Sequence, residues 1–244
     1  MRRQYKGVNL KKVNNKKDLS DNLENVFKKF NERVCNSYNL KLGEKLTYWL
    51  NYWCHNYIPI ESTFDYQNEL LNYKKGDLIS VNLGFNIGSE QGGLHYGIVL
   101  DNDNTKSNPN ITIIPLSTHE KTSKNQEELL KYEVLIDNSI FKDEIERLNN
   151  LIKSLSDKVT ETNSDKEQGK INKQITIIKK ELKKISSGEE IYAQPSQIKT
   201  VSKLRIYYPT EVNDILYNIN VGDHIMKEIE DKFKDLFFGK SIDN

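Results

Sequence analysis

Two histidines and a glycine-rich segment are the parts of this sequence best suited to chemistry. His95 follows the segment Gly88 to Gly93, and His119 follows Ser117 at the end of an aliphatic run. A histidine side chain titrates near neutrality and can give or take a proton, while the amide groups of a glycine-rich loop can bind an anion. A single histidine near a strand end is also a common surface residue with only a hydrogen-bonding role. Both interpretations are open for His95 and His119.

Short runs of β-branched and aliphatic residues would place these side chains at strand ends. The segment Asp101 to Asn110 is rich in turn formers and is expected to be a loop. Because each half alone would leave unpaired strand edges, Lys75 to Ile136 and Ile191 to Tyr208 are expected to form one barrel. The expected strands are Asp77 to Leu83, Gly97 to Leu100, Ile111 to Leu116, Tyr132 to Ile136 and a further strand from Ile191.

The first part of the chain has the spacing of two amphipathic helices. From Leu19 onward, apolar residues recur three or four positions apart, with Asp18 or Ser20 as the N-cap. The second helix is expected over Glu44 to Tyr57 and should end at Pro59.

The tryptophans and cysteines of these helices are expected to be buried. Trp49 and Trp53 share one face of the second helix, which favours packing in the helical pair over base stacking. Cys35 and Cys54 lie inside the helical patterns, which is typical of buried thiols in a reducing cytosol.

A long helical hairpin is expected to interrupt the barrel. Between Glu144 and Ile185 two arms carry apolar residues at heptad spacing, joined by the polar segment Thr162 to Lys170, which contains Gly169. Ser186, Ser187 and Gly188 should stop the second arm. Three roles are open for this hairpin: binding a partner, extending a substrate groove, or none. A last amphipathic helix, Val221 to Phe238, is expected to pack on the barrel.

The composition limits the classes of function. Formal charge is only +1, so the chain as a whole is not a polycation, and its basic residues concentrate in residues 1–17. No apolar run is long enough to span a membrane and no signal peptide is visible, so a cytoplasmic location is expected. The expected divisions are residues 1–17, a basic arm; 18–70, a helical region; 71–140, the first barrel part; 141–188, the hairpin; and 189–244, the second barrel part with the last helix.

Specific residues occur in and around the glycine-rich loop. Lys75-Gly76-Asp77 opens the first strand, and Gly88-Ser89-Glu90-Gln91-Gly92-Gly93 makes a long loop before the next strand and the turn at Asn102-Asp103. Ile113 to Ser117 ends in a hydroxyl residue, and Ser196 to Val201 reads SQIKTV. In these segments, and in about half of the chain overall, the sequence resembles the MazF/PemK family of type II toxin endoribonucleases.

The resemblance implies an α+β protein built on an SH3-like β-barrel of the MazF/PemK type. To this barrel the chain adds an N-terminal helical pair, an inserted antiparallel coiled-coil hairpin and a C-terminal helix. It also implies a homodimer that cuts single-stranded RNA without a metal or other cofactor, and a cognate antitoxin protein as partner. The implied catalytic residues are His95, Ser117 and His119. The implied RNA-binding residues are Ser89, Glu90, Gln91, Gly92, Gly93, Tyr96, Thr118, Gln197 and Lys199.

The sequence departs from the family at the catalytic positions. His95 and Tyr96 stand where the family usually continues with Arg-Pro, and Ser196 stands where some members have a carboxylate. Two hypotheses follow. In the first, an imidazole replaces the guanidinium and acts as acid or base; in the second, catalysis is lost and the barrel is a binding module for nucleic acid, a gyrase-type target or a regulatory partner.

Overall fold

The computed structural model describes residues 10–63, 70–119, 128, 130–162, 164–186 and 189–239. The chain divides into two compact units, Met1–Ile60 and Glu61–Asn244. Much of the basic arm expected at residues 1–17, and Ser187 and Gly188 of the expected stop, lie outside the described residues. Ser186, the first residue of that stop, directly follows the last helical residue, Ile185.

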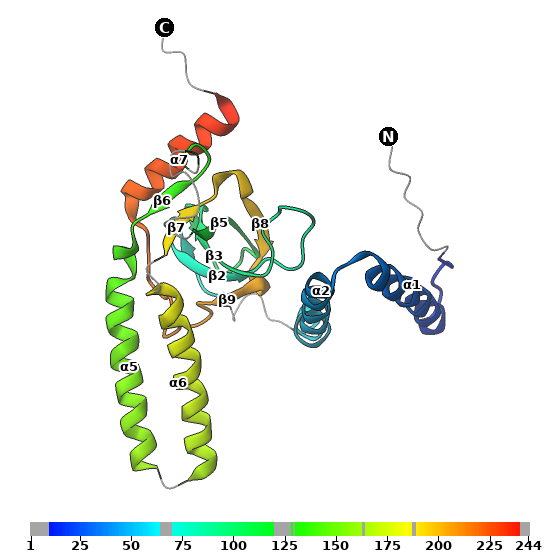
Figure 1. Ribbon diagram of the computed structural model, residues 1–244, viewed down its shortest axis with the longest axis horizontal. Coiled ribbons are helices and arrows are strands. Elements are labelled where there is room, and N and C mark those ends of the chain that lie inside the picture. Colours follow the sequence, from blue (N-terminus) through cyan, green and yellow to red (C-terminus); the bar gives the residue numbers. More distant parts are fainter. Residues whose placement is uncertain are drawn as a thin grey trace. The chain divides into compact units, whose positions relative to one another are not determined.

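The second unit is built on an antiparallel sheet (Figure 1). Its strand order is β6-β7-β5-β3-β2-β9, and β8 also pairs with β5. A separate antiparallel pair joins β1 to β4. Strand β4 lies inside the segment expected to be a loop. The strands are β1 (Tyr73–Lys74), β2 (Leu78–Asn82), β3 (Leu94–Val99), β4 (Asp103–Asn104), β5 (Asn110–His119), β6 (Val134–Ile136), β7 (Glu190–Ala193), β8 (Lys199–Ser202) and β9 (Ile206–Tyr208).

The two halves of the sequence that flank the hairpin meet in this one sheet, as their unpaired edges predict. Among the described strands, β6 and β9 end the path without pairing with each other, so the pairings do not close the sheet into a barrel. Strand β5 is longer than expected because β7 continues its ladder as far as His119, which pairs with Glu190. His95 likewise lies inside β3.

Alternate residues of the central strands face two apolar cores. Leu78 of β2 and Ile114 of β5 belong to a core that includes residues of the hairpin and the last helix. Ile79 and Ile113, their neighbours in sequence, belong to a smaller core on the opposite face. Both faces of the sheet are therefore covered, and polar side chains remain mainly at strand ends.

The hairpin consists of α5 (Lys142–Glu161), preceded by the 3-10 turn η2 (Asn138–Phe141), and α6 (Asp165–Ile185). The two helices run antiparallel and extend away from the sheet (Figure 1). The polar turn is shorter than predicted, because α6 begins at Asp165 and includes Gly169. Asp165 and Glu167 in the first turn favour this early start by their interaction with the helix dipole.

The last helix, α7 (Gly222–Phe238), packs against β6 and the 3-10 turn η3 (Pro195–Gln197). Met226 and Ile229 are buried in the larger core. Another 3-10 turn, η4 (Lys203–Arg205), links β8 to β9.

The first unit is helical, and it corrects several predictions. Helix α1 (Lys16–Ser37) begins earlier than expected, because the side chain of Asn15 caps it by accepting from the amides of Lys17 and Asp18. Helix α2 (Leu40–Tyr52) continues through a π-helical turn, η1 (Trp53–Tyr57), into α3 (Ile58–Glu61). Pro59 therefore does not end the helix. In the π-helical turn, the amide of Ile58 reaches back to the carbonyl of Trp53.

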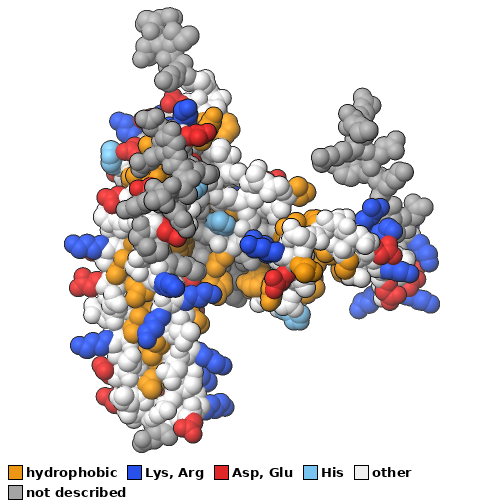
Figure 2. All heavy atoms as spheres, viewed as in Figure 1, with side chains coloured by type: hydrophobic (Ala, Val, Ile, Leu, Met, Phe, Trp, Pro, Cys, Tyr) orange, Lys and Arg blue, Asp and Glu red, His pale blue; other side chains and the backbone are white. Residues whose placement is uncertain are grey.

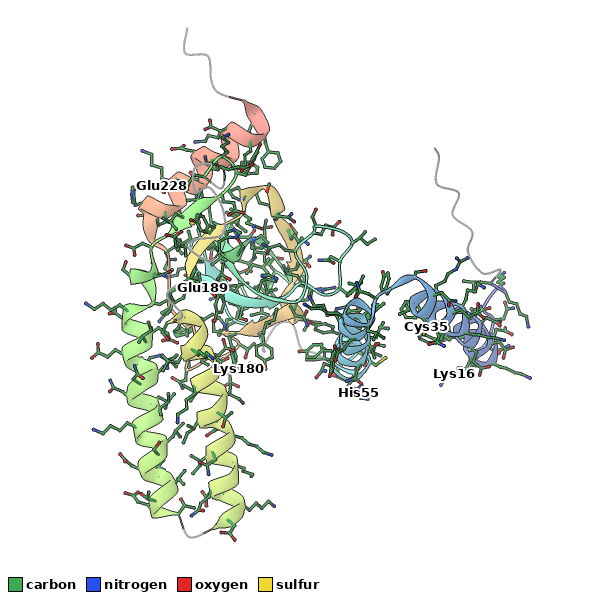
Figure 3. The ribbon with its side chains drawn as sticks, viewed as in Figure 1. Lys16, Cys35, His55, Lys180, Glu189 and Glu228 are labelled. Carbon is green, nitrogen blue, oxygen red and sulfur yellow. The ribbon has the colours of Figure 1, made fainter. Side chains whose placement is uncertain are left out.

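Few side chains of this unit are buried. Trp49 and Trp53 contact each other with ring centroids 5.1 Å apart, but Trp53 remains 43% exposed. Cys35 and Cys54 are both exposed, so the prediction of buried thiols was wrong; Figure 3 labels Cys35 on α1. These helices pack too little apolar surface to enclose the cysteines and Trp53. Among the described residues of α1 and α2, Leu46 is the one apolar residue that is buried.

Candidate active site

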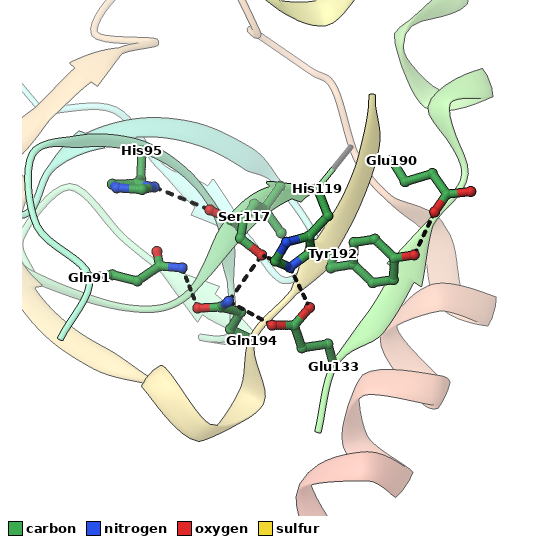
Figure 4. Close-up of polar contacts among 9 residues, drawn as sticks. Gln91, His95, Ser117, His119, Glu133, Glu190, Tyr192 and Gln194 are labelled. Atoms are coloured by element: carbon green, nitrogen blue, oxygen red, sulfur yellow. Dashed lines mark hydrogen bonds and ion pairs between the residues drawn. The ribbon is translucent and has the colours of Figure 1, made fainter. Parts of the chain in front are cut away.

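A cluster of polar side chains lies where β5, β6 and β7 meet (Figure 4). Ser117 and His119 extend from the end of β5, two residues apart and therefore on one face of the strand. Glu133 directly precedes β6, and Gln194 directly follows β7. Antiparallel pairing of β5 and β6 with β7 brings these four residues together from distant parts of the sequence.

His119 contacts two side chains through one ring nitrogen. Its Nε2 lies 2.9 Å from Oε2 of Glu133 and 3.3 Å from Oγ of Ser117. In a serine–histidine–acid triad the acid holds one ring nitrogen and the hydroxyl faces the other. The shared nitrogen therefore rules out that geometry here, and Glu133 is the closer of the two contacts. The two side chains are 17% and 13% exposed, which leaves solvent little access to the pair.

Gln194 connects the cluster to the glycine-rich loop. Its Nε2 donates to Oγ of Ser117 at 3.0 Å and to Oε1 of Glu133 at 2.8 Å. Its own Oε1 accepts from Nε2 of Gln91. Since Ser117 accepts from Gln194, the hydroxyl hydrogen of Ser117 can be donated elsewhere.

The loop is held close to the sheet by its glycines. The amide of Gly93 donates to the carbonyl of Gly84 at 2.6 Å, and the carbonyl of Gly93 accepts from the amide of Leu83 at 2.8 Å. A Cβ atom at Gly92 would lie 2.7 Å from the carbonyl oxygen of Gly84, a distance that real Cβ atoms do not tolerate. Gly93 has φ +88°, in the region that favours glycine.

Residues from η3 and β8 hold the other side of the loop. Nζ of Lys199 donates to the carbonyl of Gln91 at 2.9 Å and lies 4.0 Å from the carboxylate of Glu90. Gln197 accepts from the amide of Gln91 and donates to the carbonyl of Ser89, both at 3.5 Å. Five of the predicted RNA-binding residues are thus brought together, chiefly in contacts that position the loop.

His95 is bound to backbone on both sides of its ring. Its Nδ1 lies 3.2 Å from the carbonyl oxygen of Leu116, and its Nε2 lies 2.9 Å from that of Gly92. A neutral imidazole has one N–H and can donate to only one of these acceptors, whereas a doubly protonated ring can donate to both. His95 therefore joins the loop to β5.

A groove of about 700 Å³ runs beside this cluster. His95, Ser117 and Thr118 line it from the sheet, and residues of α6 line it from the hairpin. Tyr96 also lines it, but its hydroxyl donates to Oε2 of Glu181 on α6 at 3.0 Å. Burial, together with the charge of Glu181, raises the pKa of Tyr96 well above its usual range, so the hydroxyl stays protonated.

The structure thus separates the predicted residues into two groups. His95, Ser117 and Thr118 share the groove, and His119 adjoins Ser117 without lining it. Glu133 and Gln194 are central to the cluster but were missed by sequence reasoning. The sequence signal for Glu133 was slight, because an acid inside the strand predicted at Tyr132 to Ile136 has no recognisable partner until the pairing with β7 is known. Among the described residues, no three His, Cys, Asp or Glu side chains gather as a metal site requires.

The sheet, the constrained loop and the polar groove define a small antiparallel β-domain with helical additions. Residues 74–178 match the family model described as the PemK-like, MazF-like toxin of type II toxin-antitoxin system. The match confirms the resemblance found in the sequence. It includes the loop, both histidines and Glu133, and it ends within α6; Gln194 and β7 to β9 lie beyond it. A comparison with curated proteins finds no match. In the part of the chain that is described, no helix combines the length and apolarity of a membrane span.

Proposed function

We propose that this protein is a toxin-type endoribonuclease that cuts single-stranded RNA without a metal ion. The observation that carries the proposal is the cluster of His119, Glu133, Ser117 and Gln194 beside a groove, in a segment that matches a toxin family.

Metal-free cleavage of RNA needs a base, an acid and donors to the phosphate. The base takes the proton of a 2'-hydroxyl, whose oxygen forms a bond to the adjacent phosphorus. The bond from phosphorus to the 5'-oxygen breaks, and the acid protonates that oxygen. The products are a 2',3'-cyclic phosphate and a 5'-hydroxyl end.

His119 is the proposed base. In the neutral form with its proton on Nδ1, His119 has a lone pair on Nε2, and a substrate hydroxyl that displaces Ser117 would deliver its proton there. The new N–H would then donate to Glu133, 2.9 Å away, which would stabilise the imidazolium. The burial of this pair strengthens the interaction between the two charges.

His95 is the proposed acid, because its two carbonyl partners suit the doubly protonated ring. To protonate the leaving oxygen, it exchanges the carbonyl of Gly92 for that oxygen. The hydroxyl of Ser117, which accepts from Gln194, donates to the phosphate. Thr118 lines the same groove and is proposed as an RNA contact.

The remaining proposed RNA-binding residues shape the loop that borders the site. Gln91, Gly92 and Lys199 keep the loop in place, and Ser89 and Glu90 are exposed on it. The wider proposal follows the family: a homodimer with an SH3-like barrel in each subunit, located in the cytoplasm and held inactive by a cognate antitoxin.

The test is cleavage of a long single-stranded RNA by the purified full chain in the presence of EDTA. The expected result is discrete fragments with 2',3'-cyclic phosphate and 5'-hydroxyl ends, which are mapped by primer extension and end-specific ligation. Fragments with 3'-hydroxyl ends, or cleavage abolished by EDTA, would contradict the mechanism.

The alternative is a binding module without catalysis. It is favoured by the same contacts of His95, because a ring bound to two backbone carbonyls can serve structure alone. RNA that is bound but never cut, with or without divalent ions, would select this alternative.

A further inference from the structure

The groove beside the polar cluster has a second wall, contributed by the inserted hairpin. Lys180 and Lys183 of α6 line it opposite His95, Ser117 and Thr118. Ser117 belongs both to this lining and to the hydrogen-bonded cluster with His119 and Gln194. A ligand in the groove would therefore touch the hairpin and the cluster at once.

The part of α6 that bears these lysines is fixed to the sheet. Glu181, between them in sequence, is 5% exposed and accepts a hydrogen bond from the hydroxyl of Tyr96 on β3 at 3.0 Å. On the same helix Ile178 and Ile185 are buried in the core that includes the sheet. The side chains of Lys180 and Lys183 thus start from a rigid base, and Figure 3 labels Lys180 on the stretch of α6 nearest the sheet.

The charge of α6 is strongly one-sided. From Lys170 to Ile185 the sequence contains six lysines and a single acid, Glu181. That acid is buried against Tyr96, so the exposed charge of this stretch is positive. Lysine and arginine side chains are visible over the region where the hairpin joins the sheet (Figure 2). Glu189 is the one carboxylate among the residues that line the groove.

We propose that Lys180 and Lys183 form a phosphate-binding wall that holds a single-stranded polynucleotide in the groove. The inference rests on the proposed function for the nature of the ligand, and it assigns a role to an insertion whose role the sequence leaves open. The two lysines contact phosphates of the strand that passes Ser117, and they position the scissile phosphate without taking part in the proton transfers.

The test measures binding separately from cleavage. The probe is a fluorescein-labelled single-stranded oligoribonucleotide that is 2'-O-methylated throughout, because such a strand has no 2'-hydroxyl and cannot be cut by the proposed route. Fluorescence anisotropy gives Kd over a range of salt concentrations for the parent and for a Lys180→Gln/Lys183→Gln variant. Both lysines are exposed, so the fold should survive, and circular dichroism checks this.

A Lys166→Gln/Lys170→Gln variant is the matched control. It removes the same charge from the same helix, at exposed positions about 15 to 25 Å away along the axis. The wall variant should bind about ten-fold more weakly, and the slope of log Kd against log salt should fall by about 1.4, since each phosphate contact on a single strand contributes about 0.7. The control should match the parent.

Two results would overturn the proposal: equal binding by the wall variant and the parent, or an equal loss in the control, which would show that only bulk charge matters. The proposal would also be overturned if the parent protein does not bind the oligonucleotide but binds poly-glutamate through these lysines. That result would favour an acidic protein as the partner. If binding depends on the lysines but ordinary RNA is never cut, the phosphate-binding role of Lys180 and Lys183 is supported and the proposed nuclease activity is contradicted.

Discussion

Polar side chains lie at both ends of strand β5, but the partners to which they are hydrogen-bonded differ. Near Asn110, where β5 pairs with β8, the buried Lys203 donates through Nζ to the carbonyls of Thr105 and Leu71, at 2.7 and 3.3 Å. Near His119, where β5 pairs with β7, side chains bond to other side chains beside a groove.

This difference separates a structural cluster from a candidate site. The carbonyls that bind Lys203 can move only if the main chain at Leu71 and Thr105 moves, so Lys203 is committed to the fold. Ser117, His119, Glu133 and Gln194 can exchange partners with a ligand by rotating side chains alone. His95 combines both features, because it lines the groove but bonds to two carbonyls. The comparison predicts loss of activity from mutations at one end of β5 and loss of stability at the other.

The largest effect is expected from His119→Ala. Removing a proton-transfer group should slow RNA cleavage by about 10² to 10⁴-fold. Stability should also fall, by about 1 to 3 kcal/mol, because the carboxylate of Glu133 loses a hydrogen-bond partner and Tyr192 loses a ring contact, so the rate is taken for folded protein. The rate is measured with a fluorogenic RNA, and stability by urea unfolding. His224→Ala is the control, since His224 is exposed and pairs with Glu228 on α7. A variant that cuts as fast as the parent would remove His119 from the mechanism.

His95→Arg tests the residue that combines both features. Arginine keeps a positive charge and several N–H donors but cannot release a proton near neutrality. If His95 is the acid, the rate should fall by about 10²-fold or more, while binding of the 2'-O-methylated strand is retained. His95→Ala should in addition destabilise the fold by about 1 to 3 kcal/mol, because two carbonyls lose their donor. Parental activity in His95→Arg would make His95 a phosphate contact.

Glu133→Gln should reduce cleavage by about 10 to 100-fold, less than loss of the base itself. The amide has the size of the carboxylate but no charge with which to stabilise the imidazolium of His119. The same cleavage assay measures this, with Glu190→Gln as the control, because Glu190 accepts from the hydroxyl of Tyr192 outside the cluster. An equal loss in both variants would point to general damage at β7.

At the other end of β5, Lys203→Met should lower the free energy of unfolding by about 1 to 3 kcal/mol, the range expected for losing hydrogen bonds from a charged donor. Methionine keeps most of the apolar stem, so the effect reports the two hydrogen bonds and the contact of Nζ with the Tyr73 ring, 5.3 Å from its centroid. Cleavage by the folded variant should equal that of the parent. A loss of activity without a loss of stability would show that Lys203 serves the functional site and not only the fold.

The sequence predicted β2, β3, β5, β6, β7, both arms of the hairpin and the last helix, because each has a clear hydrophobic period. It missed the short strand β4, which lies in the segment predicted to be a loop. It could not predict how far β5 extends, since that depends on pairing with β7 across the inserted hairpin. For the same reason it missed Glu133 and Gln194, which meet Ser117 only through that pairing. It also could not distinguish His95 from His119, because the difference lies in whether the ring faces carbonyls or side chains.

The smallest expected effect is a pH dependence of stability that also originates at Lys203. Burial lowers the pKa of Lys203 to about 8, from its ordinary 10.5. Between these values the unfolded chain binds the proton that the folded chain has released, so the free energy of unfolding should rise with pH. From about pH 8 to 9.5 the gain should be about 1 kcal/mol. The window ends near pH 10, where tyrosines ionise in the unfolded chain while burial keeps Tyr73 protonated in the folded one, which reverses the trend. Urea unfolding at half-unit steps of pH measures the rise, and Lys203→Met should abolish it. If the free energy of unfolding still rises with pH in this variant, the rise comes from another titrating group and not from Lys203.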